Sequence, residues 1–174
     1  DHILIMGYTK HMIVLGIDPG SRATGFSVIT RQKSRFVLLE AGVIRTDAKA
    51  ETSERLLQIH EGIETIIQKH SPTTSAIESI FSGKSAASAL KLGQARGVAL
   101  MTLAKYGLDV TPYHPMTVKK NVGGSGRAGK KEMIRTVTFL LGLRKDLASD
   151  AADATAIAIT HLMLYSFNQK LRKR

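Results

Sequence analysis

Three short apolar runs between residues 13 and 43 constrain the fold more than any other feature of this chain. They are IVLGI (13–17), TGFSVIT (24–30) and RFVLLEAGV (35–43). Runs of this length that are rich in Val, Ile, Thr and Phe predict strands. The segment DPGSRA between the first two suits a turn, because Pro19 fixes one backbone dihedral and Gly20 permits a positive one. The chain therefore begins with a predicted meander of three strands.

Helical and strand patterns alternate after this meander. Residues 51–70 carry apolar side chains at helical spacing, with Thr52 or Ser53 as the expected cap and Pro72 beyond the end. The later segments predict a buried strand (75–81), a long Ala-rich helix (85–107), a fifth strand (108–113), a short helix from Pro115, a flexible basic loop (123–131) and two more helices (131–143 and 148–168). This order indicates an α/β fold, a mixed sheet with helices on its faces.

Length and charge limit the function. With 174 residues the chain is expected to form a single domain over residues 12–174. Its net charge of +11, in a chain that is 43% hydrophobic, indicates a globular protein with an acidic partner, for which nucleic acid is the leading candidate. We expect no membrane association, since no apolar stretch approaches the roughly twenty residues of a spanning helix.

Cysteine content and the first residues bear on the compartment. The chain has no cysteine, which excludes disulfides and thiolate metal sites and fits the reducing cytosol, so we predict a cytoplasmic protein. Residues 1–11, DHILIMGYTKH, lack the charged-then-apolar layout of a signal peptide. We expect them to be a cloning remnant or an upstream extension outside the fold.

Two carboxylates are predicted at the ends of neighbouring strands. Side chains alternate along a strand, so Gly16 and Asp18 share one face of the first strand, and Ala76 and Glu78 share one face of the fourth. If these strands are parallel neighbours, Asp18 and Glu78 lie side by side. Gly16 then leaves room on that face for a bulky backbone to approach.

Two more carboxylates lie in the segment SDAADATA. Asp150 and Asp153 are three residues apart, so they lie on the same side of the first turn of a helix. Two carboxylates about 4 Å apart repel by about 4 kcal/mol at an effective dielectric constant of about 20. A cluster of four acids is therefore expected to bind a divalent cation. A pair of Mg²⁺ ions about 3.5–4 Å apart can hold the attacking and leaving oxygens of a phosphoryl transfer.

Each acid also has a structural explanation. Asp18 alone fits the first position of a turn, and Asp150 with Asp153 fits a helix N-terminus, where the helix dipole favours acids. Glu78 is harder to explain in this way, because a buried glutamate without a partner costs several kcal/mol. Three separate coincidences are needed to explain all four acids structurally, so we favour the metal site.

The chain resembles the RuvC family of Holliday-junction resolvases, members of the ribonuclease-H-like superfamily. The resemblance lies in three motifs, GIDPGSRATGFSVI (16–29), AIESIFSGKSAASALKLGQARGVAL (76–100) and SDAADATAIAITH (149–161). It covers Met12 to about His161, with the motifs in the family's order and spacing. It implies an α/β, ribonuclease-H-like five-stranded mixed sheet flanked by α-helices.

The resemblance also implies an activity and its partners. The family resolves four-way (Holliday) DNA junctions by paired symmetric nicks in homologous recombination and DNA repair. Hydrolysis is expected in one step, without a covalent enzyme intermediate, and leaves 5′-phosphate and 3′-hydroxyl ends. The expected cofactor is Mg²⁺, two ions per active site, with Mn²⁺ as a substitute. The expected partners are the DNA junction, a second copy of the chain in a homodimer, and the branch-migration proteins RuvA and RuvB.

Position by position, the family's catalytic residues fall on the acids chosen above. The implied catalytic and metal-binding residues are Asp18, Glu78, Asp150 and Asp153. Lys119 and Lys130 match basic positions that contact DNA or assist cleavage, and Lys130 is the one predicted to be catalytic.

The predicted DNA-binding residues are Phe81, Lys119, Lys120, Arg127 and Lys131. Phe81 matches an aromatic residue that meets bases near the junction point, although an aromatic at a strand end also fits a core position. The lysines also fit a solvated face. Arg127 and Lys131 make the loop more basic than its family counterpart. His161 is expected to be structural, since it lies about 12 Å along the helix from Asp153.

Two other classes of protein share part of this pattern. GIDPGSRATG also resembles the first phosphate-binding loop of actin-like ATPases and sugar kinases, but those folds need a second such lobe, for which 174 residues leave no room. A non-catalytic DNA-binding protein would account for the charge and leave the acids without a role. A metal titration separates the three, since only the nuclease needs Mg²⁺ to cut DNA and only the ATPase binds nucleotide.

Overall fold

A computed structural model describes residues 12–79 and 85–172, with residues 166–172 described as helical backbone. The strands are β1 (Ile13–Asp18), β2 (Ala23–Gln32), β3 (Arg35–Arg45), β4 (Thr74–Glu78) and β5 (Val110–Tyr113). The helices are α1 (Thr52–His70), α2 (Ala86–Lys105), α3 (Pro115–Gly123), α4 (Lys130–Leu140) and α5 (Ser149–Arg172). Each corresponds to a predicted element. The segment 1–11 and Phe81 lie outside the described residues. Within the described ranges, no helix has the length and apolar character needed to cross a membrane.

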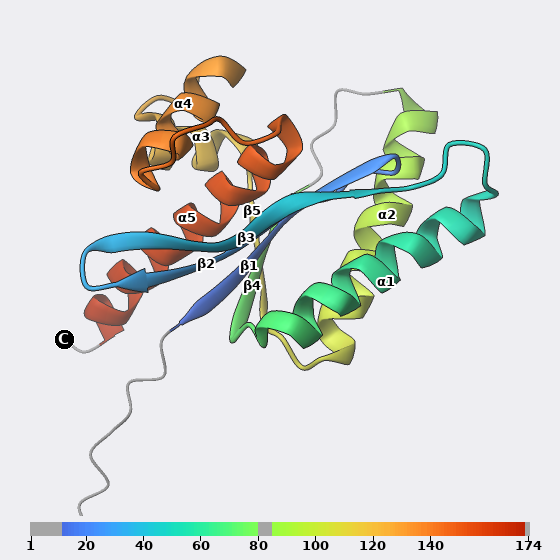
Figure 1. Ribbon diagram of the computed structural model, residues 1–174, viewed down its shortest axis with the longest axis horizontal. Coiled ribbons are helices and arrows are strands. Elements are labelled where there is room, and N and C mark those ends of the chain that lie inside the picture. The colour runs from blue at the N-terminus through green and yellow to red at the C-terminus, as the bar shows by residue number, and fades with distance from the viewer. Residues whose placement is uncertain (1–11, 80–84, 173–174) are drawn as a thin grey trace, which may run out of the picture.

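The strands form one mixed sheet in the order β3-β2-β1-β4-β5 (Figure 1). β1 pairs antiparallel with β2, and β2 with β3, which confirms the predicted meander. β1 pairs parallel with β4, and β4 with β5. Gly16 lies opposite Ala76, so Asp18 and Glu78 end adjacent parallel strands at the same edge of the sheet. The predicted α/β architecture is confirmed.

The helices divide between the two faces of the sheet: α1 and α2 cover one, and α3, α4 and α5 cover the other (Figure 1). Alternation along β1 sends Leu15 and Ile17 to the α1/α2 face and Val14 to the α5 face. On the α1/α2 face the strands pack against large aliphatic side chains, among which Ile59 and Ile63 of α1 are fully buried. Side chains therefore separate these helices from the sheet.

On the α5 face the helix backbone lies directly against the strands. A Cβ atom placed on Gly16 would lie 2.4 Å from the carbonyl oxygen of Ala154, and one placed on Gly25 would lie 2.0 Å from that of Asp150. Both distances are shorter than real Cβ contacts, so a larger residue at either position requires the backbone of α5 to move. The buried Ala154 and Ala158 keep the helix narrow at the same place. The backbone approach predicted at Gly16 is that of α5.

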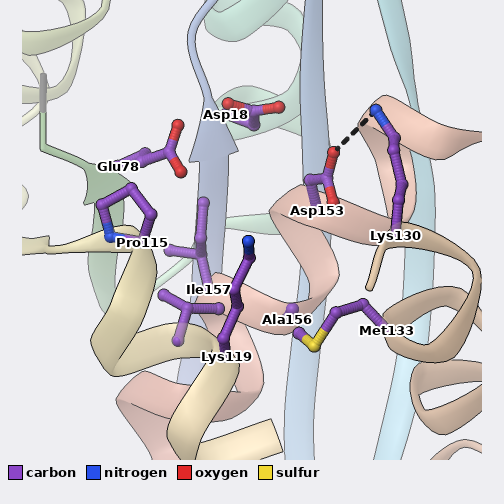
Figure 2. A pocket seen from close by; sticks show the side chains of 10 residues that line it. Asp18, Glu78, Pro115, Lys119, Lys130, Met133, Asp153, Ala156 and Ile157 are labelled. Carbon is purple, nitrogen blue, oxygen red and sulfur yellow. Dashed lines mark ion pairs between the residues drawn. The ribbon is translucent and has the colours of Figure 1, made fainter. Parts of the chain in front are cut away.

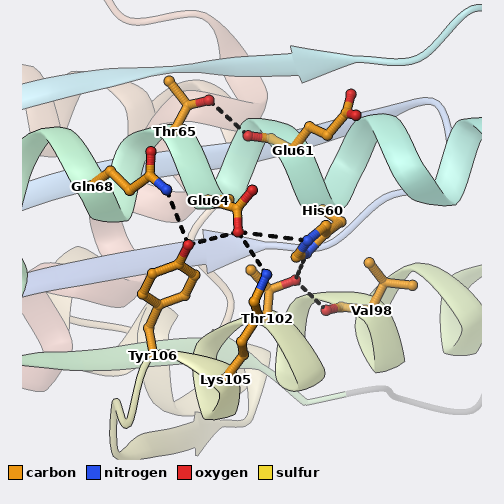
Figure 3. A network of polar contacts seen from close by, with 9 residues as sticks. All are labelled: His60, Glu61, Glu64, Thr65, Gln68, Val98, Thr102, Lys105 and Tyr106. Carbon is orange, nitrogen blue, oxygen red and sulfur yellow. Dashed lines mark hydrogen bonds and ion pairs between the residues drawn. The ribbon is translucent and has the colours of Figure 1, made fainter.

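A polar network joins α1 to α2 away from this contact (Figure 3). The Glu64 carboxylate accepts hydrogen bonds from Lys105 Nζ at 2.8 Å and from the Tyr106 hydroxyl at 2.6 Å. His60 Nδ1 lies 2.8 Å from Thr102 Oγ1. The hydrogen bonds from Lys105 and Tyr106 lower the pKa of Glu64. This carboxylate is therefore ionised and balanced by a neighbouring cation.

The start of α1 differs from the prediction. Glu51 is the N-cap residue, and both Thr52 and Ser53 lie inside the helix. The reason is that the first turn closes through a 3.0 Å bond from the Arg55 N–H to the Glu51 carbonyl. Glu51 makes no side-chain capping bond, so the sequence preference for Thr or Ser at a cap is not used here.

The predicted loop 123–131 is shorter than expected. α3 extends through Gly123 and α4 begins at Lys130, so Lys130 and Lys131 belong to the first turn of a helix. The Glu132 carboxylate accepts a hydrogen bond from the Gly129 N–H at 3.2 Å, which stabilises this turn. The positions of both lysines are therefore set by helix geometry.

Candidate active site

Three carboxylates meet at the edge of the sheet where β1 and β4 end (Figure 2). Asp18 is the last residue of β1, Glu78 is the last residue of β4, and Asp153 reaches the same place from α5. They line one pocket together with Lys119, Lys130 and apolar residues from α3, α4 and α5. The parallel pairing of β1 with β4 is what places the first two acids side by side.

Asp150 joins this group from the first turn of α5. It does not line the pocket, but Asp18, Asp150 and Asp153 each offer one carboxylate oxygen, and these three atoms lie within 4.8 Å of one another. Asp153 lies one turn after Asp150, so the prediction that both belong to the first turn is wrong, although helical spacing keeps them on one side. Glu78 forms a hydrogen bond with Asp18. The structure thus brings all four predicted acids together.

Ionisation of Asp18 and of Asp153 is unfavourable in the protein alone. Burial, together with the nearby carboxylates of Glu78, Asp153 and Asp150, raises the pKa of Asp18 to about 8. Burial also raises the pKa of Asp153, against the opposing effect of Lys130. A cation shared by the carboxylates would remove this cost. A set of oxygen donors with this spacing fits a divalent cation.

The predicted basic residues divide into two groups. Lys119 and Lys130 line the pocket, and Lys130 Nζ lies 3.5 Å from Asp153 Oδ2. Lys120 follows Lys119 in α3 but is exposed and does not line the pocket, because consecutive helical residues point about 100° apart. The other predicted residues that are exposed and outside the pocket lining are Arg127 and Lys131.

One contact at this edge was not predicted. Arg96, midway along α2, donates a hydrogen bond from Nε to the backbone carbonyl of Glu78 at 3.0 Å. The signal in the sequence was that Arg96 is the single charged residue of the stretch LGQARGVAL (92–100). Periodicity places this arginine on a helix but does not connect it with β4.

His161 packs inside the fold, as expected. It is 3% exposed, and its ring nitrogens lie 3.0 Å from the Tyr113 hydroxyl and 3.3 Å from Thr74 Oγ1. Burial lowers its pKa. These contacts join α5 to β4 and β5.

The antiparallel meander, the parallel β1–β4 pair and the acids at the strand ends define a protein of the ribonuclease-H-like class, with an acidic cluster that suits a divalent metal. The match to one family is specific and long. The chain belongs to the crossover junction endodeoxyribonuclease RuvC family, which matches residues 14–161. The family resemblance inferred from the sequence is confirmed.

Individual relatives agree in sequence and in structure. Crossover junction endodeoxyribonuclease RuvC of Anaeromyxobacter sp. (strain K) is 49% identical over 156 residues, which cover 90% of this chain and 83% of that protein. The structure of Thermus thermophilus RuvC matches with a TM-score of 0.82 and 32% identity, covering 90% of this chain and 97% of that one. A structure of T. thermophilus RuvC in complex with Holliday junction substrate matches with a TM-score of 0.86 and 33% identity, over 91% and 97% of the two chains.

Proposed function

We propose that this protein is a structure-selective endonuclease that resolves four-way (Holliday) DNA junctions by paired symmetric nicks in recombination and repair. The observation that carries the proposal is the cluster of four acids at one edge of a ribonuclease-H-like sheet. Membership of the RuvC family supports it, as does the match to a RuvC structure that contains a Holliday junction. The net charge of +11 suits a polyanionic substrate.

The acids are the proposed metal ligands and catalytic residues: Asp18, Glu78, Asp150 and Asp153. Two bound Mg²⁺ ions, or Mn²⁺ in their place, would supply charge stabilisation and an activated nucleophile for hydrolysis of a phosphodiester to a 5′-phosphate and a 3′-hydroxyl. Asp18 has Glu78 on one side and the acids of α5 on the other. It is therefore the acid proposed to be shared by both ions.

The basic residues have proposed roles that follow their positions. Lys130, beside Asp153 in the pocket, is the proposed catalytic lysine, and Lys119 shares that pocket and would bind the phosphate next to the cut. Lys120, Arg127 and Lys131 are proposed to bind phosphates of the junction arms. Phe81 is proposed to contact bases near the junction point.

The proposed active form is a homodimer built on the exposed face of α2. Leu90 and Met101 are 65% and 51% exposed, and a Cβ atom placed on Gly97 would meet nothing within 4 Å. Their spacing puts them on one side of the helix. This forms an apolar surface with a small residue at its centre. Two copies related by a two-fold axis would supply one active site for each of two symmetric nicks.

The proposed setting follows from the family. We propose a single nuclease domain over residues 12–174 that acts with RuvA and RuvB in the cytoplasm, because its proposed substrate is DNA undergoing branch migration. Binding of RuvA and RuvB to the purified protein on a four-way junction tests this part of the proposal.

A nicking assay tests the central proposal. A four-way junction is compared with a linear duplex of the same sequence, with and without Mg²⁺. We expect paired nicks in the junction alone, only with Mg²⁺, with ends that a ligase can reseal. Equal cutting of the duplex, or cutting without a divalent ion, would contradict the proposal. Sedimentation of the protein with bound junction tests the dimer, and a monomer there would exclude it.

A further inference from the structure

The Arg96 side chain of α2 is bonded to the end of the strand that carries Glu78. Its Nε donates a 3.0 Å hydrogen bond to the Glu78 backbone carbonyl. Glu78 is the last residue of β4, and the pairing of β4 with β1 ends one residue earlier, where Ile17 lies opposite Ile77. Arg96 therefore forms a hydrogen bond with β4 at a residue that is no longer paired with β1.

The peptide group after Glu78 is held at both ends. Its N–H, which belongs to Ser79, donates to the Tyr113 carbonyl of β5 at 2.9 Å. Its carbonyl, which belongs to Glu78, points to the opposite side and accepts from Arg96. One bond comes from the sheet and the other from a helix. The backbone of Glu78 is thus fixed in two directions just before the chain leaves the sheet.

This restraint acts on the residue that carries one of the clustered carboxylates. Glu78 lies next to Asp18, with two further acids on α5 close by. Metal binding requires these carboxylates to be ionised together, and without a restraint their repulsion would then move the end of β4 away from β1. A hydrogen bond from a guanidinium is stronger than one between neutral groups.

We propose that Arg96 is a positioning residue, which holds Glu78 beside Asp18 in the place needed to bind a divalent cation and acts only through the Glu78 backbone carbonyl. The inference rests on the proposed metal-dependent function of the acid cluster. Loss of a group that orients a metal ligand costs about 10–100-fold in metal affinity or activity. The same range is expected here.

Two substitutions separate the hydrogen bond from the charge. Arg96→Gln keeps an N–H donor at the same point along the side chain and removes the charge. Arg96→Met keeps the apolar length and removes both. Lys91→Met, at an exposed position of the same helix, is the matched control for loss of a positive charge. Arg96→Leu, which also lacks a donor, replaces Arg96→Met in the series if the methionine variant does not fold.

Metal affinity is the first measurement, made by calorimetry with Mg²⁺ or Mn²⁺ on the protein without DNA. Arg96→Met, or Arg96→Leu in its place, is expected to bind the ion about 10-fold more weakly. Arg96→Gln should lose less affinity than this, because it keeps a neutral donor, and Lys91→Met should match wild type. At saturating junction, the Mg²⁺ concentration for half-maximal nicking should rise by the same factor. Junction binding in EDTA and the melting temperature should change little.

Three outcomes would overturn the proposal. Wild-type metal affinity in Arg96→Met, or in Arg96→Leu where it takes its place, would show that the bond to Glu78 is only structural. Equal loss in Arg96→Gln and Arg96→Met would assign the effect to charge. Weaker junction binding in EDTA would make Arg96 a DNA contact. If wild-type protein binds metal but does not nick junctions, the proposed nuclease function fails, and calorimetry still decides the role of Arg96.

Discussion

On the α5 face of the sheet the helix backbone touches the strands at Gly16 and Gly25, whereas on the α1/α2 face side chains such as Ile63 separate helix from sheet. The carboxylates of the two faces differ as well. Burial and neighbouring acids raise the pKa of Asp18. Hydrogen bonds from Lys105 and Tyr106 lower that of Glu64. One carboxylate therefore requires a ligand to be stable in its charged form, and the other is stabilised by the protein itself.

The difference shows that one kind of contact positions the acids of the active site and another kind stabilises the fold. A side chain can change rotamer when its neighbour moves, so packing such as that of Ile63 tolerates small changes. A backbone in contact with a backbone has no such freedom. The α5 face therefore fixes where Asp150 and Asp153 lie relative to Asp18, and the α1/α2 face contributes mainly to the free energy of folding.

The largest expected effect distinguishes the carboxylates of the two faces. Asp18→Asn and Asp153→Asn should each lower the nicking rate by about 10³-fold, because each removes a proposed metal ligand. Junction binding should be unchanged or tighter, since a negative charge is removed. Glu64→Gln is the control and should cut at the normal rate. Nicking by either aspartate variant at the rate of this control would remove that acid from the active site.

The next effect compares the backbone contact with side-chain packing. Gly16→Ala should lower the nicking rate by about 10²-fold, because its Cβ atom displaces α5 and the acids that it carries. Ile63→Val on the other face should cost about 0.5–1.5 kcal/mol of stability and leave nicking unchanged. The nicking rate at saturating junction and the stability in urea denaturation are measured for both variants. A Gly16→Ala enzyme of normal rate would mean that α5 adjusts freely.

Two lysines sharpen the comparison between pocket and surface. Lys130→Ala should lower the nicking rate at saturating junction by about 10-fold, beyond its loss of binding, because Lys130 lies in the pocket. Lys120→Ala should affect binding alone and reduce the slope of log affinity against log salt by about 0.9. A normal saturated rate for Lys130→Ala would make this lysine an electrostatic contact only.

The fourth effect is the pH dependence of the stability of the metal-free protein. Folded protein holds the Asp18 proton more tightly than unfolded chain, so this group stabilises the fold at low pH, and the stabilisation is lost as the pH rises from about 4 through about 8. Asp18→Asn should remove this dependence and make the metal-free protein more stable than wild type at pH 8. Urea denaturation in EDTA at pH 5 and pH 8 measures it. Added Mg²⁺ should stabilise wild type more than the variant, and the reverse order would contradict the metal site.

The smallest effect has the opposite sign. The pKa of Glu64 is lowered by Lys105 and Tyr106, so its contribution to stability is present at neutral pH and is lost as the pH falls through the lowered value. Glu64→Gln should lower the melting temperature slightly at pH 7 and have no effect at pH 3. Thermal denaturation at both values tests this. A larger effect at pH 3 would show that the hydrogen bonds rather than the charge stabilise the α1–α2 contact.

Local periodicity was sufficient for much of the fold. Alternation along β1 predicted both the face on which Asp18 lies and the close approach at Gly16, because strand geometry depends only on neighbours in the chain. The first residues of the helices could not be predicted from local periodicity in this way. Glu51 caps α1 and Lys130 opens α4 because of backbone bonds in which several adjacent residues compete, and the sequence does not show which residue wins.

The candidate site was predictable where its residues end or begin an element. Asp18 and Glu78 are the last residues of their strands and Asp150 lies in the first turn of α5, and these elements meet at one edge of the sheet. The distinction between Lys119 and Lys120 required the rotation of α3 about its axis. The bond between Arg96 and the Glu78 carbonyl joins the middle of a helix to a backbone atom, and only the packed path of the chain brings these two together.

The position of β1 in the sheet has a consequence for the order of folding. One of its neighbours, β2, is next in the chain, and the other, β4, follows only after β3 and α1. Adjacent strands pair within microseconds, whereas distant segments must first close a long loop. We expect the meander to form first, β4 to dock later, and α5 to complete the structure. Glu78 then meets Asp18 only when β4 docks, and the acids of α5 join them in the last step, so repulsion among the four does not slow the formation of the meander.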